Sequence, residues 1–210
     1  MPHAKAKFIA IEGLEGAGKT TAIETMKHYF AAKDIDVCYT REPGGTPVAE
    51  QIREILITPY PEESLCAEAE LLLMYASRIQ HTRNLIQPML EKGTWVISDR
   101  FHWSSLAYQG GGRKLGFERV KQLDTLILNG FKPDVTLYLD ITPEIGLKRA
   151  KTRKALDRIE QETLDFFERA REVFLTLAAE EPTCTVIDGT QSYPRVQADI
   201  INFLAKKTGK

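Results

Sequence analysis

Residues 8–21 read Phe-Ile-Ala-Ile-Glu-Gly-Leu-Glu-Gly-Ala-Gly-Lys-Thr-Thr, and this stretch decides which fold the chain can adopt. The apolar run 8–11 is typical of a buried strand, and residues 21–27 have a helical pattern. Between them stands G-x-x-x-x-G-K-T, the pattern of a phosphate-binding loop, or P-loop. A chance match in a glycine-rich turn would require neither the strand nor the helix. The stretch therefore predicts binding of a nucleoside triphosphate.

Each part of this loop has an expected role toward the phosphates. The glycines let the backbone turn tightly and direct its N–H groups inward, and the helix N-terminus adds partial positive charge. Lys19 would reach the β- and γ-phosphates, and the Thr20 hydroxyl would bind Mg²⁺. The predicted nucleotide-binding residues of the loop are Gly13, Leu14, Glu15, Gly16, Ala17, Gly18, Lys19, Thr20 and Thr21.

Bulk properties narrow the class of protein. With 210 residues, 43% of them hydrophobic, the chain can bury one core, and we expect a single domain over residues 1–210. A net charge of −1 provides no overall field for nucleic acid or an anionic membrane, so neither is expected as a partner. The N-terminus does not resemble a signal peptide, and no apolar run approaches membrane-spanning length. Three widely spaced cysteines favour a cytoplasmic location over a disulfide framework or a zinc site.

Short apolar runs alternate with helical patterns along the chain. The runs are residues 8–11, 37–40, 95–98, 135–139 and 185–187. The helical patterns cover about residues 47–57, 67–90, 117–128, 143–153, 164–180 and 193–206. This alternation predicts a three-layer α/β fold of the P-loop NTPase class, with a five-stranded parallel sheet flanked by helices. Ligands of such sheets collect at the carboxyl ends of the strands, so functional residues should follow each run.

Charged residues do follow the second and third runs. Arg41 precedes a Pro-Gly-Gly turn and is either an anion ligand or a surface arginine. Asp99 closes the third run and resembles a Walker B acid, which acts on Mg²⁺ or its waters. Arg100 has the geometry for a bidentate phosphate contact. The alternative for these two residues is a buried ion pair that only fixes the strand end.

Two helical segments carry residues four positions apart, which share a helix face. Met74 and Arg78 could cover a base and its polar edge, or they could be a core methionine and a solvent-reaching arginine. Arg149 and Arg153 belong to residues 148–158, which hold six cations and one acid. That segment could offset phosphate charge, or it could be a solvated basic helix or a polynucleotide-binding patch.

Taken together, these segments resemble bacterial thymidylate kinases. Beyond the P-loop, the matching segments are TREPGGT at 40–46, SDR at 98–100, SSLAYQG at 104–110, DVTLYLD at 134–140 and LDRIE at 156–160. Their combination and order are more specific than any one motif. The resemblance implies ATP-dependent phosphorylation of dTMP to dTDP, for dTTP synthesis, by a homodimeric enzyme that uses Mg²⁺.

The resemblance also implies roles for individual residues. Glu15 would face the acceptor near its sugar 3′-OH, and Tyr108 would lie against the deoxyribose, leaving no room for a 2′-OH. Arg149 would pack against adenine, and the Glu42–Pro43 peptide would be cis. The implied acceptor-binding residues are Glu15, Arg41, Pro43, Met74, Arg78, Arg100, Ser105, Tyr108 and Gln109. The metal would be held by Thr20 and Asp99.

The resemblance further points to the source of the catalytic arginine. The P-loop has Leu14, Gly16 and Ala17 where some relatives carry a basic residue. It is therefore similar to the class that supplies the arginine from a lid, here about residues 148–160. Arg153 is the first candidate and Arg158 the second. With Lys19, Arg100 and Glu15 they form the predicted catalytic set.

Met74 stands where relatives usually carry a phenylalanine stacked on thymine. A methionine can cover a base face through its polarizable sulfur, so another nucleoside monophosphate or a deoxynucleoside as acceptor stays an alternative. A GTPase-type switch would need an Asn-Lys-x-Asp motif, which this sequence lacks. A binding protein without activity is the third alternative, and it is disfavoured by the intact set Lys19, Thr20, Asp99, Arg100 and Arg153.

Overall fold

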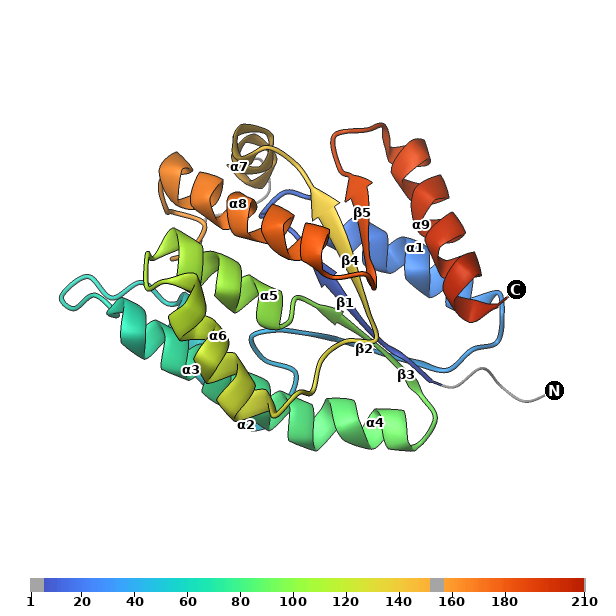
Figure 1. Ribbon diagram of the computed structural model, residues 1–210, viewed down its shortest axis with the longest axis horizontal. Coiled ribbons are helices and arrows are strands. Elements are labelled where there is room, and N and C mark those ends of the chain that lie inside the picture. Colours follow the sequence, from blue (N-terminus) through green and yellow to red (C-terminus); the bar gives the residue numbers. More distant parts are fainter. Residues whose placement is uncertain (1–5, 152–156, 210) are drawn as a thin grey trace.

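The computed structural model describes residues 6–151 and 157–209 (Figure 1). Within these residues, five parallel strands form one sheet in the order β2-β3-β1-β4-β5. The strands are β1 (Phe8–Glu12), β2 (Val37–Arg41), β3 (Trp95–Asp99), β4 (Val135–Asp140) and β5 (Cys184–Asp188). The predicted five-stranded parallel sheet is therefore confirmed.

Helices cover both faces of this sheet. They are α1 (Lys19–Ala31), α2 (Pro47–Ile57), α3 (Ala67–His81), α4 (Gln87–Glu91), α5 (His102–Ser105), α6 (Phe117–Leu128), α7 (Pro143–Lys151), α8 (Leu164–Glu180) and α9 (Tyr193–Thr208), with π-helical turns η1 (Thr82–Ile86) and η2 (Leu106–Gly112). Helices α1 and α9 pack together over one face, and α4, α5 and α8 lie over the other (Figure 1). The predicted three-layer arrangement is thus confirmed.

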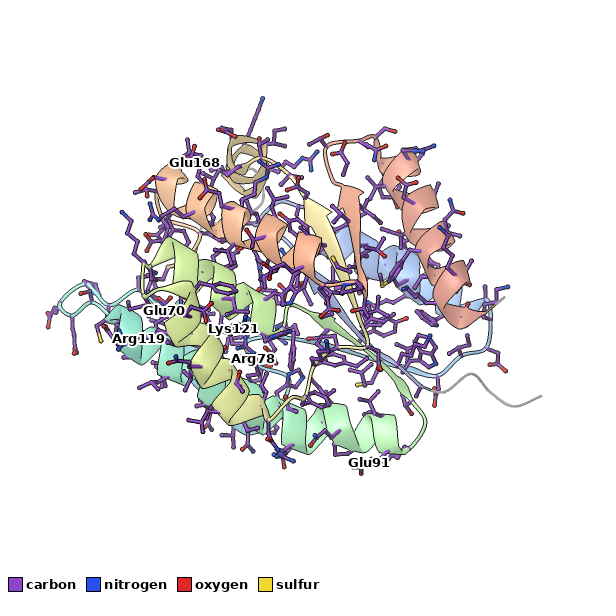
Figure 2. All side chains as sticks on the ribbon, viewed as in Figure 1. Glu70, Arg78, Glu91, Arg119, Lys121 and Glu168 are labelled. Atoms are coloured by element: carbon purple, nitrogen blue, oxygen red, sulfur yellow. The ribbon has the colours of Figure 1, made fainter. Side chains whose placement is uncertain are left out.

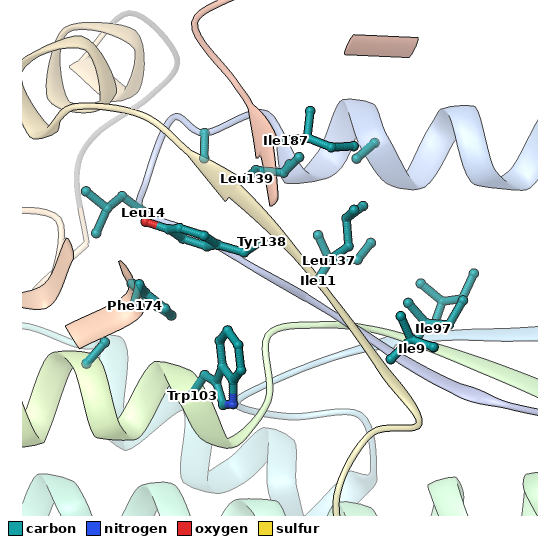
Figure 3. Packing of buried hydrophobic residues seen from close by; sticks show 14 of the residues in the cluster. Ile9, Ile11, Leu14, Ile97, Trp103, Leu137, Tyr138, Leu139, Phe174 and Ile187 are labelled. Carbon is teal, nitrogen blue, oxygen red and sulfur yellow. The ribbon is translucent and has the colours of Figure 1, made fainter. Parts of the chain in front are cut away.

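The central strands β1, β3 and β4 are buried on both faces, as their continuous apolar character predicted, whereas the edge strands β2 and β5 are only partly buried. Figure 3 shows Tyr138 and Phe174 on one side of β4, and Leu137 and Ile187 on the other. The rings of Tyr138 and Phe174 stack with centroids 5.3 Å apart. Successive side chains of a strand point to opposite faces, so each of these central strands joins the two helical layers through its own core residues.

Local sequence signals explain where several helices begin. Thr46 caps α2 by accepting a hydrogen bond from the Ala49 N–H at 3.4 Å, and Pro47 takes the first helical position. Thr163 caps α8 in the same way, with the Phe166 N–H at 3.3 Å. Helix α1 instead begins after Gly18 without a side-chain cap, which leaves its first N–H groups available to a ligand.

The predicted helix over residues 67–90 is interrupted. It consists of α3, the π-helical turn η1 and the short helix α4, which has Pro88 in its first turn. Proline has no N–H and its ring clashes with the carbonyl four residues earlier, so a regular α-helix cannot run through it unchanged. A wider π turn just before the proline accommodates this constraint. In the described part of the chain, no helix is long and apolar enough to cross a membrane.

Candidate active site

A cavity of about 340 Å³ lies at the carboxyl ends of the strands. All nine residues predicted for the acceptor, from Glu15 to Gln109, line it. So do Gly16, Lys19, Thr20 and Asp99, whereas the other predicted P-loop residues and Arg149 do not. Residues at or just after the ends of β1, β2 and β3 line this cavity, as expected for a parallel sheet, whereas those directly after β4 and β5 do not.

The Lys19 ammonium is hydrogen-bonded to the backbone of the P-loop. The Lys19 ammonium donates hydrogen bonds to the Gly13 and Leu14 carbonyl oxygens at 3.0 and 2.9 Å. Burial, with the nearby charge of Arg100, lowers the pKa of Lys19 to about 8. A bound phosphate would favour the charged ammonium. Lys19 is thus placed to bind a phosphate that enters the loop.

A carboxylate, a guanidinium and a phenol meet beside the P-loop. Glu15 accepts hydrogen bonds from Arg100 at 2.6 Å and from the Tyr108 hydroxyl at 2.8 Å. The Arg100 guanidinium lies over the Tyr108 ring, 5.1 Å from its centroid, and also donates to the Gly13 carbonyl at 2.9 Å. Burial alone would raise the pKa of Glu15, but Arg100, Lys19 and Tyr108 outweigh it and lower that pKa. Burial raises the pKa of Tyr108 well above its usual value, so the phenol stays protonated.

Arg100 adopts a backbone conformation that is unusual for its residue type. Its φ is 71°, in the left-handed region, where a residue with a Cβ is strained. Two hydrogen bonds hold it there: the Arg100 N–H donates to the Ile11 carbonyl at 2.8 Å, and the Ser98 hydroxyl donates to the Arg100 carbonyl at 2.7 Å. This turn directs the guanidinium back toward the P-loop.

Tyr108 and Gln109 are presented by the π-helical turn η2. The glycines that follow them permit close packing against α8. A Cβ on Gly111 would lie 2.8 Å from the Val173 side chain, and one on Gly112 would lie 2.5 Å from the Phe166 ring. These glycines therefore allow η2 to approach α8 and fix the direction of the two cleft residues.

The Arg78 guanidinium is held by three hydrogen bonds and by a contact with an aromatic ring. Its guanidinium donates to the Glu42 carboxylate at 2.7 Å, to the Ser105 hydroxyl at 3.0 Å and to the Phe101 carbonyl at 3.1 Å. It also lies over the ring of Tyr75, 4.8 Å from the centroid. The Glu42–Pro43 peptide in the same wall is cis, as expected.

One carboxylate oxygen of Asp99 is buried but unpaired within the described part of the chain. Its Oδ1 is buried and has no hydrogen-bond partner among the described residues. An unpaired buried acceptor costs about 1–3 kcal/mol, and a cation or its bound waters would satisfy it. No group of three or more His, Cys, Asp or Glu side chains in the described residues could hold a metal ion. The unpaired Asp99 oxygen fits an ion such as Mg²⁺, which binds through one or two carboxylates when phosphate oxygens complete its shell.

The buried carboxylate of Glu70 binds Arg158. Glu70 accepts hydrogen bonds from Gln109 at 2.7 Å, from Arg158 at 2.6 Å and from Arg113 at 3.0 Å, and Arg113 also pairs with Glu162. Burial alone would raise the pKa of Glu70, but these donors lower it. Figure 2 shows Glu70 and Arg78 on α3. Arg158 does not line the cavity, although its neighbours Asp157 and Ile159 do.

The remaining predicted residues are placed as follows. Arg149 donates to the Gly16 and Gly189 carbonyl oxygens at 3.3 and 2.9 Å, which puts it behind the P-loop and next to the turn after β5. Arg153 lies outside the described residues. Helix α7 touches the P-loop backbone through Gly146, where a Cβ would lie 2.4 Å from the Glu15 carbonyl oxygen.

Comparison with known proteins gives the family. A sequence model of the thymidylate kinase family, described as "Thymidylate kinase", matches residues 11–200. The chain belongs to the thymidylate kinase family. A thymidylate kinase of Shewanella sp. (strain MR-4) is 50% identical over 206 residues, which cover 97% of this chain and 98% of the relative. The thymidylate kinase of Pseudoalteromonas translucida (strain TAC 125) is 50% identical over 200 residues, covering 95% and 96% of the two chains. That of Francisella philomiragia subsp. philomiragia is 49% identical over 201 residues, covering 96% and 98%.

The cleft of this family member also contains polar residues that sequence patterns did not predict. They are Glu42, Arg53, Ser104, Asp157 and Glu160. Glu42 had a weak signal, because it stands between Arg41 and a turn at a strand end. Glu70 had none, because its donors lie far away in the sequence.

We expect that Glu70→Gln destabilises this thymidylate kinase family member by about 3 kcal/mol at neutral pH. The amide keeps the shape of the side chain but cannot neutralise Arg113 and Arg158. Because the folded-state pKa of Glu70 is lowered, the stabilisation is present above the usual carboxyl pKa of about 4.3 and is lost as the pH falls through the folded value. Urea unfolding at several pH values measures the difference.

The matched control is Glu162→Gln, which removes the other carboxylate that pairs with Arg113. The Glu162 side chain is 26% exposed, whereas that of Glu70 is 1% exposed. We therefore expect a loss below about 1 kcal/mol for the control. Equal losses for the two variants would contradict a special role for the buried carboxylate.

Proposed function

We propose that this protein transfers the γ-phosphoryl group of ATP to dTMP, giving ADP and dTDP. The observation that carries the proposal is a single cleft that contains the P-loop lysine and a second group of polar side chains, formed by Glu15, Arg100 and Tyr108. One side suits the phosphates of a nucleoside triphosphate and the other suits a second, smaller nucleotide. Membership of the thymidylate kinase family supports dTMP as that nucleotide.

On the donor side, the protein binds and aligns the phosphates. The free N–H groups at the start of α1 and the Lys19 ammonium bind the β- and γ-phosphates. Thr20 and Asp99 would hold Mg²⁺ together with phosphate oxygens. When bound, that ion offsets the negative charge between the two nucleotides. Arg149, behind the P-loop, lies on the side where the adenine would pack.

On the acceptor side, the protein needs no general base. A phosphate monoester has a second pKa of about 6, so dTMP is mostly a dianion at neutral pH and is already nucleophilic. Arg100 orients this dianion beside the P-loop, and Lys19 reduces the repulsion between the two sets of phosphates. Tyr108 stays protonated because its pKa is raised, so it acts by hydrogen bonding and by its shape.

The base and the sugar are selected by the opposite wall. Arg78 and Ser105 present donors toward the base edge, and Met74 lies one helical turn before Arg78. Tyr108 would lie against the deoxyribose and leave no room for a 2′-OH. The fixed orientation of Arg78 favours one pattern of acceptors on the base.

A coupled ADP-release assay with ATP and Mg²⁺ tests this proposal. We expect the highest kcat/KM with dTMP among dTMP, dUMP, UMP, dCMP and dGMP. UMP should be poorer than dUMP by about tenfold or more, because its 2′-OH meets Tyr108. Tyr108→Ala should reduce this ratio. Preference for another acceptor would indicate that Met74 marks a changed base pocket, and no turnover with any acceptor would contradict the proposal.

The lid arginine is the second part of the proposal. Arg153 is our candidate for the group that meets the charge on the transferred phosphoryl, a role worth about 10³-fold or more in rate. Arg158 is bound to Glu70 and the Leu56 carbonyl, so it would have to leave both to take this role. We expect Arg153→Ala to lower kcat by about 10³-fold with a small change in the KM for ATP. A normal kcat for Arg153→Ala, with a large loss for Arg158→Ala, would assign the role to Arg158.

We also infer that the 210 residues form one domain, that the protein works in the cytoplasm, and that two copies associate. Cys38, Cys66 and Cys184 are free thiols, which suits a reducing compartment. Leu72 on α3 and Leu126 on α6 are 60% and 76% exposed, on helices that contact each other. An apolar surface of this kind suits a homodimer.

Analytical ultracentrifugation tests the association. We expect a dimer for the wild type and a monomer for Leu126→Glu, because a charge buried at an interface without a partner is costly. Lys121→Glu on the same helix is the control for charge alone and should leave the dimer intact. A monomeric wild type at micromolar concentration would contradict this inference.

A further inference from the structure

A chain of hydrogen-bonded side chains runs behind the acceptor side of the cleft. The Thr40 hydroxyl lies 2.7 Å from Nε2 of His81, and Nδ1 of His81 lies 3.1 Å from Oε1 of Glu42. The other oxygen of Glu42, Oε2, accepts from Nε of Arg78 at 2.7 Å. His81, Glu42 and Arg78 are 0%, 5% and 2% exposed. The chain therefore links the end of β2 to the guanidinium that faces the base, and water does not compete with it.

The chemistry of the groups determines the direction of these hydrogen bonds. A carboxylate paired with Arg78 can only accept, so Nδ1 of His81 donates to Glu42. The other ring nitrogen, Nε2, is hydrogen-bonded to the Thr40 hydroxyl. Both polar atoms of the His81 ring are then satisfied, and the positive charge of Arg78 faces the negative charge of Glu42. His81 is thus held in one orientation.

Glu42 would not be fixed without His81. The terminal torsion of a glutamate is broad, so a carboxylate held by one hydrogen bond can rotate. A buried carboxylate oxygen without a partner is also costly, because it has lost its hydrogen bonds to water. By occupying Oε1, His81 fixes the plane of the carboxylate and so the direction of its bond to Arg78. The guanidinium plane of Arg78 decides which base edge it can read.

The neighbouring turn leaves space for this arrangement. Gly45 has a φ of 92°, and a Cβ there would lie 2.5 Å from Nε2 of His81 and 2.6 Å from Oγ1 of Thr40. Any side chain at this position would therefore push the histidine away from the threonine. The same turn is held to α3 by the Gly44 N–H, which donates to the Ser77 hydroxyl at 3.1 Å.

We infer that His81 is a positioning residue for the acceptor base: it fixes Glu42, and Glu42 fixes Arg78. It does not touch the reacting atoms. The inference deepens the proposed function and depends on it, because it concerns recognition of dTMP by Arg78. It adds His81, Thr40 and Gly45 to the residues on which base selection depends.

Steady-state kinetics with dTMP varied at saturating ATP tests this role. His81→Leu removes both hydrogen bonds, and we expect the KM for dTMP to rise about tenfold while the KM for ATP stays within about twofold. His81→Asn can still donate to Glu42 from the position of Nδ1, so its KM for dTMP should stay within about threefold of the wild type. Thr40→Val removes only the hydroxyl and should fall between the two.

The matched control is Thr82→Val, at the residue that follows His81. The Thr82 hydroxyl is buried and has no hydrogen-bond partner among the described residues, so its loss should leave both KM values unchanged. A lowered Tm for His81→Leu with an unchanged KM for dTMP would overturn the inference, because the role would then be structural only. A KM for His81→Asn as high as that for His81→Leu would overturn it as well.

Two further outcomes separate this inference from the proposed function. If His81→Leu does not fold, the KM values of His81→Asn and Thr40→Val decide, and equality of Thr40→Val with Thr82→Val overturns the inference. If the wild type does not phosphorylate dTMP, both the proposed function and the inference fail. An active wild type with a KM for dTMP that no variant changes contradicts the inference alone.

Discussion

The structure depends on one electrostatic constraint: two cations must stay close together beside the P-loop before any phosphate arrives. Lys19 and Arg100 would repel each other there, and the charge of Arg100 contributes to the lowered pKa of Lys19. Glu15 relieves this repulsion, since it pairs with Arg100 and favours the charged form of Lys19. The left-handed backbone at Arg100 and the π-helical turn that carries Tyr108 both serve this contact. Two polyanions can then bind to a site that is already arranged for them.

In the walls of the cleft, other buried carboxylates likewise bind nearby donor groups and hold them in place. Glu12 accepts from the Phe101 N–H at 2.9 Å and from the Ser104 hydroxyl at 2.6 Å, which holds the start of α5. Glu42 holds Arg78, and Glu70 holds Gln109 together with Arg158. A buried carboxylate is costly unless its lone pairs are used. Because each of these is bonded to several donors, each fixes its part of the wall in one conformation.

Much of the fold could be predicted from the sequence, because its signals are local. The P-loop, the apolar strands and helix α8, which Thr163 caps, all show sequence patterns that extend over only a few residues. The segment 102–112 carries no such pattern, because its three glycines disfavour a helix, and the structure shows helical turns there that pack against α8. The cleft residues after the strands followed from the topology, whereas Glu70 and His81 did not. Their roles depend on partners from other elements, which no local pattern specifies.

Helix α3 connects these separate features. Glu70, Met74, Arg78 and His81 recur at the spacing that places residues on one face of a helix. Glu70 binds Arg158, Met74 and Arg78 line the cleft, and His81 reaches the turn after β2. Leu72 lies on the opposite face and is exposed. One helix thus carries the contact with Arg158, two residues of the cleft wall and an exposed leucine. A change in the position of α3 would therefore alter all three together.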